Sequence, residues 1–173
     1  MEIQLLLKDK NIKGKEKTQI ISELLVNKKL TLDALIEVAK VSKESEKATC
    51  IEAVEYVTKS KPEICTATMI EFAAQQLADK APRVKWESAR VIGNCAPLFP
   101  GKLKLALENL LLNSEHSGTV VRWSTAYALG EIVKLKNFQK ELAPALEAIM
   151  QREEKNSIKK IYAAALKKIK TNK

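Results

Sequence analysis

One stretch of the chain, VKWESARVIG at residues 84–93, returns twice further along the sequence. It reappears as VRWSTAYALG at residues 121–130 and as IKKIYAAALK at residues 158–167, so both shifts are 37 residues. A weaker copy, shifted by about 35, covers residues 49–56. Two equal shifts in succession indicate internal repeats, and internal repeats constrain the whole fold.

Five further segments have the spacing of amphipathic helices. In residues 103–112 the apolar side chains fall at i, i+3, i+4, i+7 and i+8, which places them on one stripe of a helix. The motif SKPE at residues 60–63 predicts a helix start, as a capping box with proline in the first turn. The five segments are residues 1–7, 32–41, 64–77, 103–112 and 138–150. Each repeat is therefore predicted to be a pair of helices.

The composition fits a helical protein and excludes several other classes. Of the 173 residues, 46% are hydrophobic and 29% are charged, with only five glycines and five prolines, which argues against disorder and against a turn-rich β architecture. Cys50, Cys65 and Cys95 lack metal-like spacing and are expected to be reduced core residues. No apolar run reaches the roughly 18 residues of a membrane span, and residues 1–7 do not form a secretion signal. We therefore expect a soluble, cytoplasmic protein with no membrane partner.

Residues 121–132 resemble the second helix of a HEAT repeat, in the pattern Val-Arg-x-x-x-Ala-x-Ala-Leu-Gly-x-Ile, and LAPAL at residues 142–146 resembles a first helix. The resemblance is to the short, alanine-rich variety of the family and is strongest from residue 63 to residue 170. Paired helices stacked in one direction make an all-α fold, a right-handed α-solenoid of about five HEAT-like repeats. We expect a single domain over residues 1–173, with units at about 1–27, 30–59, 62–97, 101–136 and 137–170.

The same resemblance implies a polar ladder between the repeats. Members of the family usually carry an acid before the second helix, and three acids of this chain stand near that position. They would bond along the stack to bases at the start of the second helices, namely Asp79, Glu115 and Glu153 to Lys85, Arg122 and Lys159. Such pairing is structural and implies no chemistry.

The surface that packing leaves over follows from the direction of the side chains along residues 121–133. At 100° per residue the apolar side chains share one sector, which must face the partner helix, whereas Trp123, Tyr127 and Glu131 point to the opposite side. Their equivalents in the neighbouring repeats are Trp86, Arg90, Asn94, Lys160, Ala164 and Lys168. Because second helices of HEAT repeats line the concave side, the resemblance places these residues together in a groove.

Two tryptophans in one register, both outside the apolar sector, indicate a recognition surface, since aromatic and arginine side chains are enriched in interface hot spots. The predicted partner-binding residues are Trp86, Arg90, Arg122, Trp123, Tyr127 and Lys160. The expected partner is a protein or peptide segment, bound by a rigid scaffold at little cost in ordering entropy. The alternative is that the indoles pack into the seam between neighbouring helices.

The net charge of +9 is concentrated at one end, where residues 151–173 carry eight basic and two acidic side chains. Nucleic acid would be attracted to that end, with candidate phosphate contacts at Lys159, Lys167, Lys168 and Lys170. Lys173 belongs to the same group of cations. Alternatively, these lysines only complement the helix dipole and keep the terminal repeat in solution.

We expect no catalysis, no cofactor and no metal. The sequence has no phosphate loop, zinc motif or catalytic triad, and His116 is its only histidine. One enzymatic relative to consider is the HEAT-like DNA glycosylases that excise alkylated purines, which carry groove tryptophans with an acid one turn along. Here Arg90 and Tyr127 stand at i+4, and Glu87 is expected to point about 100° away from Trp86. The alternative function is therefore nucleic-acid binding without the catalytic carboxylate; the partner, the oligomeric state and the pathway stay open.

Overall fold

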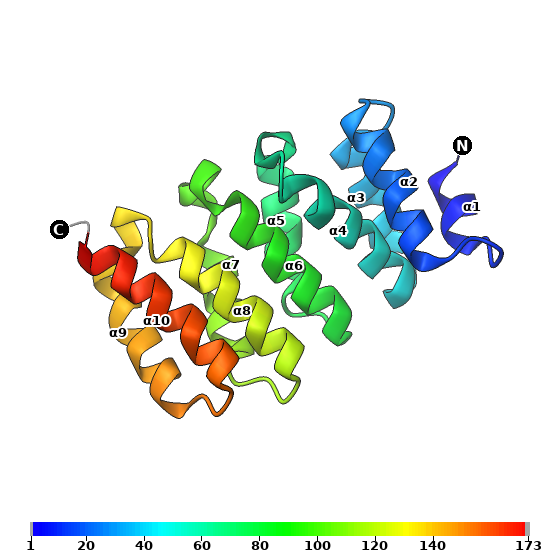
Figure 1. The fold of residues 1–173 in the computed structure, drawn as a ribbon. Coiled ribbons are helices and arrows are strands. Elements are labelled where there is room, and N and C mark those ends of the chain that lie inside the picture. Colours follow the sequence, from blue (N-terminus) through cyan, green and yellow to red (C-terminus); the bar gives the residue numbers. More distant parts are fainter. Residues whose placement is uncertain (1, 172–173) are drawn as a thin grey trace.

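The computed structural model describes residues 2–171, and this part of the chain folds into ten α-helices joined by short loops and three 3₁₀ turns (Figure 1). The helices are α1 (Ile3–Lys8), α2 (Gly14–Val26), α3 (Leu32–Val41), α4 (Glu44–Thr58), α5 (Ala67–Gln76), α6 (Pro82–Cys95), α7 (Lys104–Asn113), α8 (Thr119–Ile132), α9 (Lys136–Arg152) and α10 (Asn156–Thr171). The 3₁₀ turns are Pro62–Ile64, Ala96–Leu98 and Pro100–Lys102. Consecutive helices pair in chain order, which gives five helix pairs.

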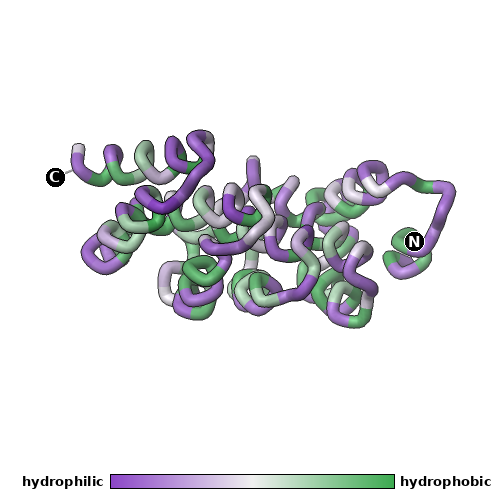
Figure 2. Tube along the Cα trace, turned by 90° about the horizontal axis from the view of Figure 1, so that it is seen from below, coloured by the Kyte–Doolittle hydropathy of each residue, from purple (hydrophilic) through white to green (hydrophobic). Residues whose placement is uncertain are grey.

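The pairs stack into two layers. The second helix of each pair packs on the second helix of the next, from α2 through α4, α6 and α8 to α10, and the first helices form the other layer. Figure 2 shows the stack from below, with the two ends of the chain far apart and the α10 end raised above the middle of its layer. The second helices thus lie on the inner, concave side. The predicted fold class, a right-handed α-solenoid of helix pairs, is confirmed.

The core lies between the two layers and follows the predicted pattern. Every residue assigned to the apolar sector of the second helix at 121–133 is buried: Val121, Thr125, Ala126, Ala128, Leu129, Ile132 and Val133. The three cysteines are also buried, and they are free thiols, as expected for small core residues. Within residues 2–171, no helix combines the length and apolarity that crossing a membrane requires.

One predicted helix start is wrong. The SKPE motif does not cap a helix, because Pro62–Ile64 forms a 3₁₀ turn and the hydroxyl of Ser60 donates to the carbonyl of Val57 at 3.4 Å. Helix α5 begins instead after Thr66, whose side-chain oxygen accepts a hydrogen bond from the backbone N–H of Met69 at 3.2 Å. A threonine cap of this kind satisfies one of the free N–H groups of the first turn.

A row of three bonds, here called the inter-repeat ladder, crosses the repeat boundaries. Each bond joins a basic side chain in the first turns of a second helix to an acceptor at or just after the end of the next pair's first helix. They are Lys47 Nζ to Asp79 Oδ2 (2.8 Å), Lys85 Nζ to Asn113 Oδ1 (3.0 Å) and Arg122 Nε to Glu153 Oε2 (2.9 Å). The ladder therefore runs from each repeat to its successor.

This arrangement corrects the pairing expected from the family resemblance. Of the expected acids and bases, only Arg122 and Glu153 bond to each other in the ladder. Lys85 uses Asn113 rather than an acid, and Glu115 instead pairs with Arg152 at 3.0 Å. Lys47 and Lys85 occupy equivalent positions in the ladder, so the repeat that contains α4 is offset from the next by 38 residues (from 47 to 85). The sequence comparison had predicted an offset of about 35 residues for this repeat.

The middle rung explains why an amide stands where the others have an acid. The side-chain NH₂ of Asn113 donates to the backbone carbonyl of Leu77 at 2.9 Å while its oxygen accepts from Lys85. A carboxylate could accept but not donate, so it would leave this carbonyl with one partner fewer. Asn113 is buried, which makes complete pairing of its polar atoms important for stability.

Candidate binding surface

Trp123 is an exposed aromatic side chain on α8, the fourth helix of the second-helix layer. It lies on α8 with 41% of its surface accessible, and its ring stacks on Tyr127, one helical turn further on. The ring centroids are 6.3 Å apart and the planes differ by 11°. The outward direction predicted for Trp123 is thus confirmed, while Tyr127 is half-buried beneath it.

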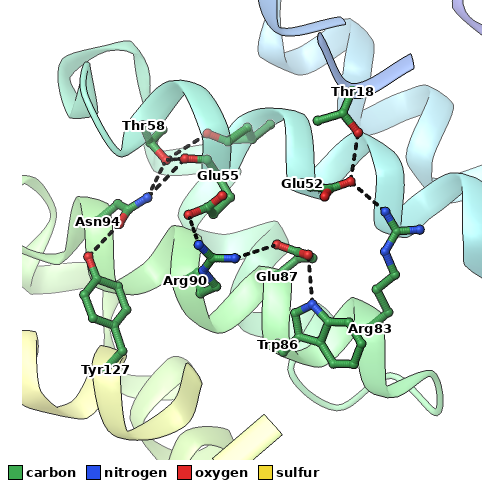
Figure 3. A network of polar contacts seen from close by, with 11 residues as sticks. Thr18, Glu52, Glu55, Thr58, Arg83, Trp86, Glu87, Arg90, Asn94 and Tyr127 are labelled. Atoms are coloured by element: carbon green, nitrogen blue, oxygen red, sulfur yellow. Dashed lines mark hydrogen bonds and ion pairs between the residues drawn. The ribbon is translucent and has the colours of Figure 1, made fainter. Parts of the chain in front are cut away.

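Tyr127 is held in place from the neighbouring helix α6. Its hydroxyl donates to Asn94 Oδ1 at 2.7 Å, and the Asn94 NH₂ group donates in turn to the carbonyl of Glu55 and the hydroxyl of Thr58 on α4 (Figure 3). The ring also lies against Gly93, where an added Cβ would come within 2.5 Å of Tyr127 Cε1. Glycine is therefore required for this close approach. The stack of Trp123 on Tyr127 is a rigid feature that three helices support.

Trp86 differs from Trp123 in both exposure and bonding. It is half-buried, and its indole N–H donates to Glu87 Oε1 at 2.8 Å. The expectation that Glu87 points away from Trp86 is therefore wrong, because the flexible side chain bends back to the indole. We call the three aromatic residues of the predicted surface, Trp86, Trp123 and Tyr127, the aromatic cluster; of these, Trp123 and Tyr127 stack on each other.

Beside the aromatic cluster, carboxylates and guanidinium groups from α4 and α6 alternate across the surface (Figure 3). Arg83 lies 2.6 Å from Glu52, which also accepts a hydrogen bond from Thr18 on α2 at 2.8 Å. Arg90 lies 2.8 Å from Glu55 and 3.8 Å from Glu87. We call these five charged residues the face network: Glu52, Glu55, Arg83, Glu87 and Arg90.

Glu87 is the least well paired member of the face network. It is only 4% exposed, and its Oε2 atom is buried without a hydrogen-bond partner within the described chain. Burial raises the pKa of Glu87 to about 7, although the hydrogen bond from Trp86 lowers it, and the negative charge of Glu52 adds to the rise. Burial also raises the pKa of Glu55, against the attraction of Arg90.

Arg122 lies apart from the aromatic cluster, in the inter-repeat ladder. Both Glu153 oxygens accept hydrogen bonds from it, and its Nη1 atom donates to the carbonyls of His116 and Ser117. Burial alone would raise the pKa of Glu153, but the hydrogen bonds from Arg122 and from the Lys155 N–H lower it overall. Since the Arg122 guanidinium is occupied in this way, it is not available on the second-helix surface.

The predicted lysine contacts lie along α10, one repeat away from the aromatic cluster. Lys159 is half-buried, and the others in the described part of the helix are exposed: Lys160, Lys167, Lys168 and Lys170. Lys170 lies 3.3 Å from Glu147. Lys173 falls outside the described residues. Phosphate binding at these lysines stays a prediction.

Sequence reasoning missed the acids of the face network. Glu52 and Glu55 stand among buried apolar residues of α4, and acids at such positions are a signal in themselves, since buried carboxylates are rarely found without partners. Asn94 was placed on the correct face but without its bridging role. Among residues 2–171, no group of three or more His, Cys, Asp or Glu side chains is arranged to hold a metal ion.

No protein-family model matches the sequence, and no curated protein matches it either. Solved structures do resemble the fold. A designed armadillo repeat protein aligns with a TM-score of 0.73 and 18% identity, over 96% of this chain and 80% of that one. The structure of the complex of CpcE and CpcF of phycocyanin lyase from Nostoc sp. PCC7120 aligns with a TM-score of 0.69 and 20% identity, over 94% and 96%.

A second designed armadillo repeat protein, whose structure is a complex with the peptide (KR)4, aligns with a TM-score of 0.58 and 13% identity, over 97% of this chain and 98% of that one. Identities at this level establish the fold and no more. The chain is a helical-repeat solenoid whose fold is similar to that of armadillo and HEAT-like repeat proteins, and its assignment to the HEAT family in particular stays a prediction.

Proposed function

We propose that this protein is a non-catalytic scaffold that binds a segment of a protein partner across its second-helix layer. The observation that carries the proposal is the exposed Trp123 ring, stacked on Tyr127 and fixed through Asn94 to two further helices. A large aromatic ring that needs no reordering loses little conformational entropy when a partner covers it. The aromatic cluster would therefore act as the central anchor of the interface.

Two of the similar structures support this proposal by analogy of fold. The lyase structure is a complex of two proteins, and the second designed armadillo protein is bound to a peptide. A solenoid presents a continuous surface made of several repeats, which suits an extended segment better than a small molecule. Exposed aromatic side chains add to this preference because they are enriched at protein interfaces.

The test begins with a peptide-display selection against the folded protein. Peptides enriched on the wild type should bind about 30-fold more weakly to Trp123→Ala, which corresponds to about 2 kcal/mol, because the variant removes the anchor ring. Isothermal titration calorimetry measures the affinities, and circular dichroism checks the fold.

Leu112→Ala is the matched control for this variant. Leu112 is also a large exposed apolar residue, but it lies on α7 in the opposite layer. Selected peptides should bind Leu112→Ala as tightly as they bind the wild type. If the enriched peptides bind Trp123→Ala with unchanged affinity, the proposed surface is wrong.

A further inference from the structure

The inter-repeat ladder is followed by one further base that has no acceptor in the described chain. Lys159 stands 37 residues after Arg122 (from 122 to 159), in the position from which Lys85 and Arg122 reach the following helix pair. It is half-buried, yet its Nζ atom forms no hydrogen bond or ion pair within residues 2–171. The nearby acid Glu153 is bonded to Arg122 instead. A ladder base in this state can take an acceptor that another molecule supplies.

The side of α10 that carries Lys159 is exposed, whereas the matching side of α8 is buried by the next pair. At 100° per residue this side of α10, here called the end face, is formed by Lys159, Ala163, Lys167 and Lys170. Only Lys159 among them is half-buried, and the others are exposed. The equivalent residues of α8 are Arg122, Ala126, Gly130 and Val133, of which the last three are buried. Gly130 lies against α10, since an added Cβ would come 3.4 Å from the Cβ of Ala165.

Lysine replaces small and apolar side chains on the end face. Lys167 stands where α8 has Gly130, and Lys170 where it has Val133. A further repeat of the same kind would have to bury these cations, which is costly unless each finds a partner. Helix α10 contains five lysines and no acid, and Lys170 is bonded only to Glu147 on α9, at 3.3 Å. The end face therefore suits a partner that brings its own carboxylates.

A groove of about 460 Å³ lies beside these lysines, between α9 and α10 at the C-terminal end of the stack (Figure 1). Met150 of α9 and Leu166 of α10 line it, together with Ala163 of the end face. Lys167 and Lys170 also line the groove. Apolar side chains can thus enter the groove while carboxylates on the same segment reach the lysines.

We propose that the end face is a second interaction surface, which binds an acidic helical segment of a partner protein and pairs one of its carboxylates with Lys159. The existing bonds of the ladder support this choice of acceptor, because each base lies 2.8–3.0 Å from a side-chain oxygen of Asp79, Asn113 or Glu153. The partner would continue the ladder by one bond. Since Trp123 takes no part, the inference goes beyond the proposed function.

A second copy of this chain is a poorer occupant of the end face. The acid that it could offer is Asp9, whose Oδ1 atom accepts from the N–H two residues on at 2.8 Å, as that of Asp79 does. Exposed lysines surround Asp9 in the sequence, namely Lys8, Lys10 and Lys13. Placing them opposite the lysines of α10 would bring like charges together, which lowers affinity. Charge complementarity therefore favours a partner that is richer in acid than this chain.

The experiment measures binding of a short helical peptide of alanine, leucine and glutamate by fluorescence anisotropy. A peptide with glutamine in place of glutamate should bind about tenfold more weakly. Lys159→Gln should weaken binding of the glutamate peptide about tenfold, whereas Lys159→Arg should keep it, because Arg122 fills the equivalent position in the ladder. Circular dichroism checks the fold of each variant.

Lys168→Gln is the matched control, because it removes the same charge from the opposite side of α10, about 180° around the helix from Lys159. Its affinity should stay within about twofold of the wild type. Trp123→Ala should also bind the glutamate peptide normally, which separates a failure of this inference from a failure of the proposed function. Equal losses in Lys159→Gln and Lys168→Gln would overturn the inference, because the peptide would then be held only by the general positive field.

Two further measurements distinguish the occupants. A carbodiimide joins an amine to a carboxylate in contact with it, and mass spectrometry should locate the link between the peptide and the protein at Lys159. If a DNA duplex binds more tightly than the glutamate peptide and loses affinity steeply as salt rises, the end face binds phosphates and the inference is wrong. It is also wrong if light scattering shows self-association that Lys159→Gln abolishes, because the occupant is then a second copy.

Discussion

Two rows of polar side chains cross the repeat boundaries, one where the first helix of a pair ends and one on the second-helix surface. In the inter-repeat ladder every base reaches an acceptor, and Asn113 even donates onward to a backbone carbonyl. In the face network Glu87 Oε2 has no donor. The buried side-chain atoms that lack partners in the described chain all lie on α6 and α8, namely Glu87 Oε2, Ser88 Oγ and Thr125 Oγ1. The hydrogen bonds of the ladder therefore stabilise the repeat boundaries, whereas α6 and α8 bury polar atoms without hydrogen-bond partners beneath the candidate surface.

The strongest way to break this comparison is to remove an acid from the ladder. Glu153→Ala leaves Arg122 without its carboxylate, and the two side chains are only 3% and 17% exposed. Loss of one partner of a well-buried ion pair should lower the free energy of unfolding by about 3 kcal/mol. Urea unfolding followed by circular dichroism measures the change.

Glu115→Ala provides the control for the ladder variant. Glu115 also pairs with an arginine, Arg152, but it is 70% exposed, so its loss should change stability by no more than about 0.5 kcal/mol. Equal effects of the two variants would mean that the ladder does not hold the repeats together.

The second test concerns the pH dependence of stability. Burial raises the pKa of Glu87 to about 7, from its usual value of 4.5. The folded protein therefore holds this proton more tightly than the unfolded chain does. The resulting stabilisation is fully present below about pH 4.5 and is lost as the pH rises through 7.

The shift corresponds to on the order of 3 kcal/mol. Urea unfolding at pH 5 and pH 8 should show the wild type losing stability relative to Glu87→Gln, which has no carboxylate to ionise. The difference between the two proteins isolates Glu87 from Glu55 and from the remaining titrating groups. Parallel pH profiles would show that Glu87 is paired as well as the ladder acids are.

The smallest expected effect comes from removing a buried hydroxyl without a hydrogen-bond partner on α8. Thr125→Val replaces an unpartnered buried hydroxyl by a methyl group of similar shape, and should stabilise the protein by about 1 kcal/mol. Thr18→Val is the contrasting variant, because that hydroxyl donates to Glu52 at 2.8 Å and its loss should destabilise. Thermal unfolding of both variants gives the signs, and a loss of stability in Thr125→Val would contradict the assignment of an unused hydroxyl.

The sequence predicted those features that depend on one helix, and missed those that depend on two. The exposure of Trp123 follows from the turn per residue alone, and so does the burial of Val121 and its neighbours. The surroundings of Glu87 come from α4, more than 30 residues earlier, and the angle of a Cα–Cβ bond does not determine where a glutamate with three torsions bends. For the same reason Arg122 was assigned to the surface although Glu153 holds it at the repeat boundary.

The start of α5 shows a different limit. Both Ser60 and Thr66 precede plausible helix starts, and the motif at residues 60–63 has the stronger pattern. The choice between the two was made by tertiary packing, which leaves Pro62–Ile64 as a 3₁₀ turn against α4 and α6. A capping motif depends only on residues near it in the sequence, so it cannot show which of two possible helix starts the tertiary packing favours.

Each ladder bond runs from one repeat to the following repeat, so the two ends of the solenoid are held by different contacts. Among the polar contacts of the next pair, removing α1 and α2 would take away only hydroxyl groups, such as that of Thr18 from Glu52. Removing α9 and α10 would instead strand the Arg122 charge. Because losing the C-terminal pair costs more, fraying should begin at the N-terminal pair and progress toward the C-terminal one, and hydrogen exchange along the chain would record that direction as a gradient.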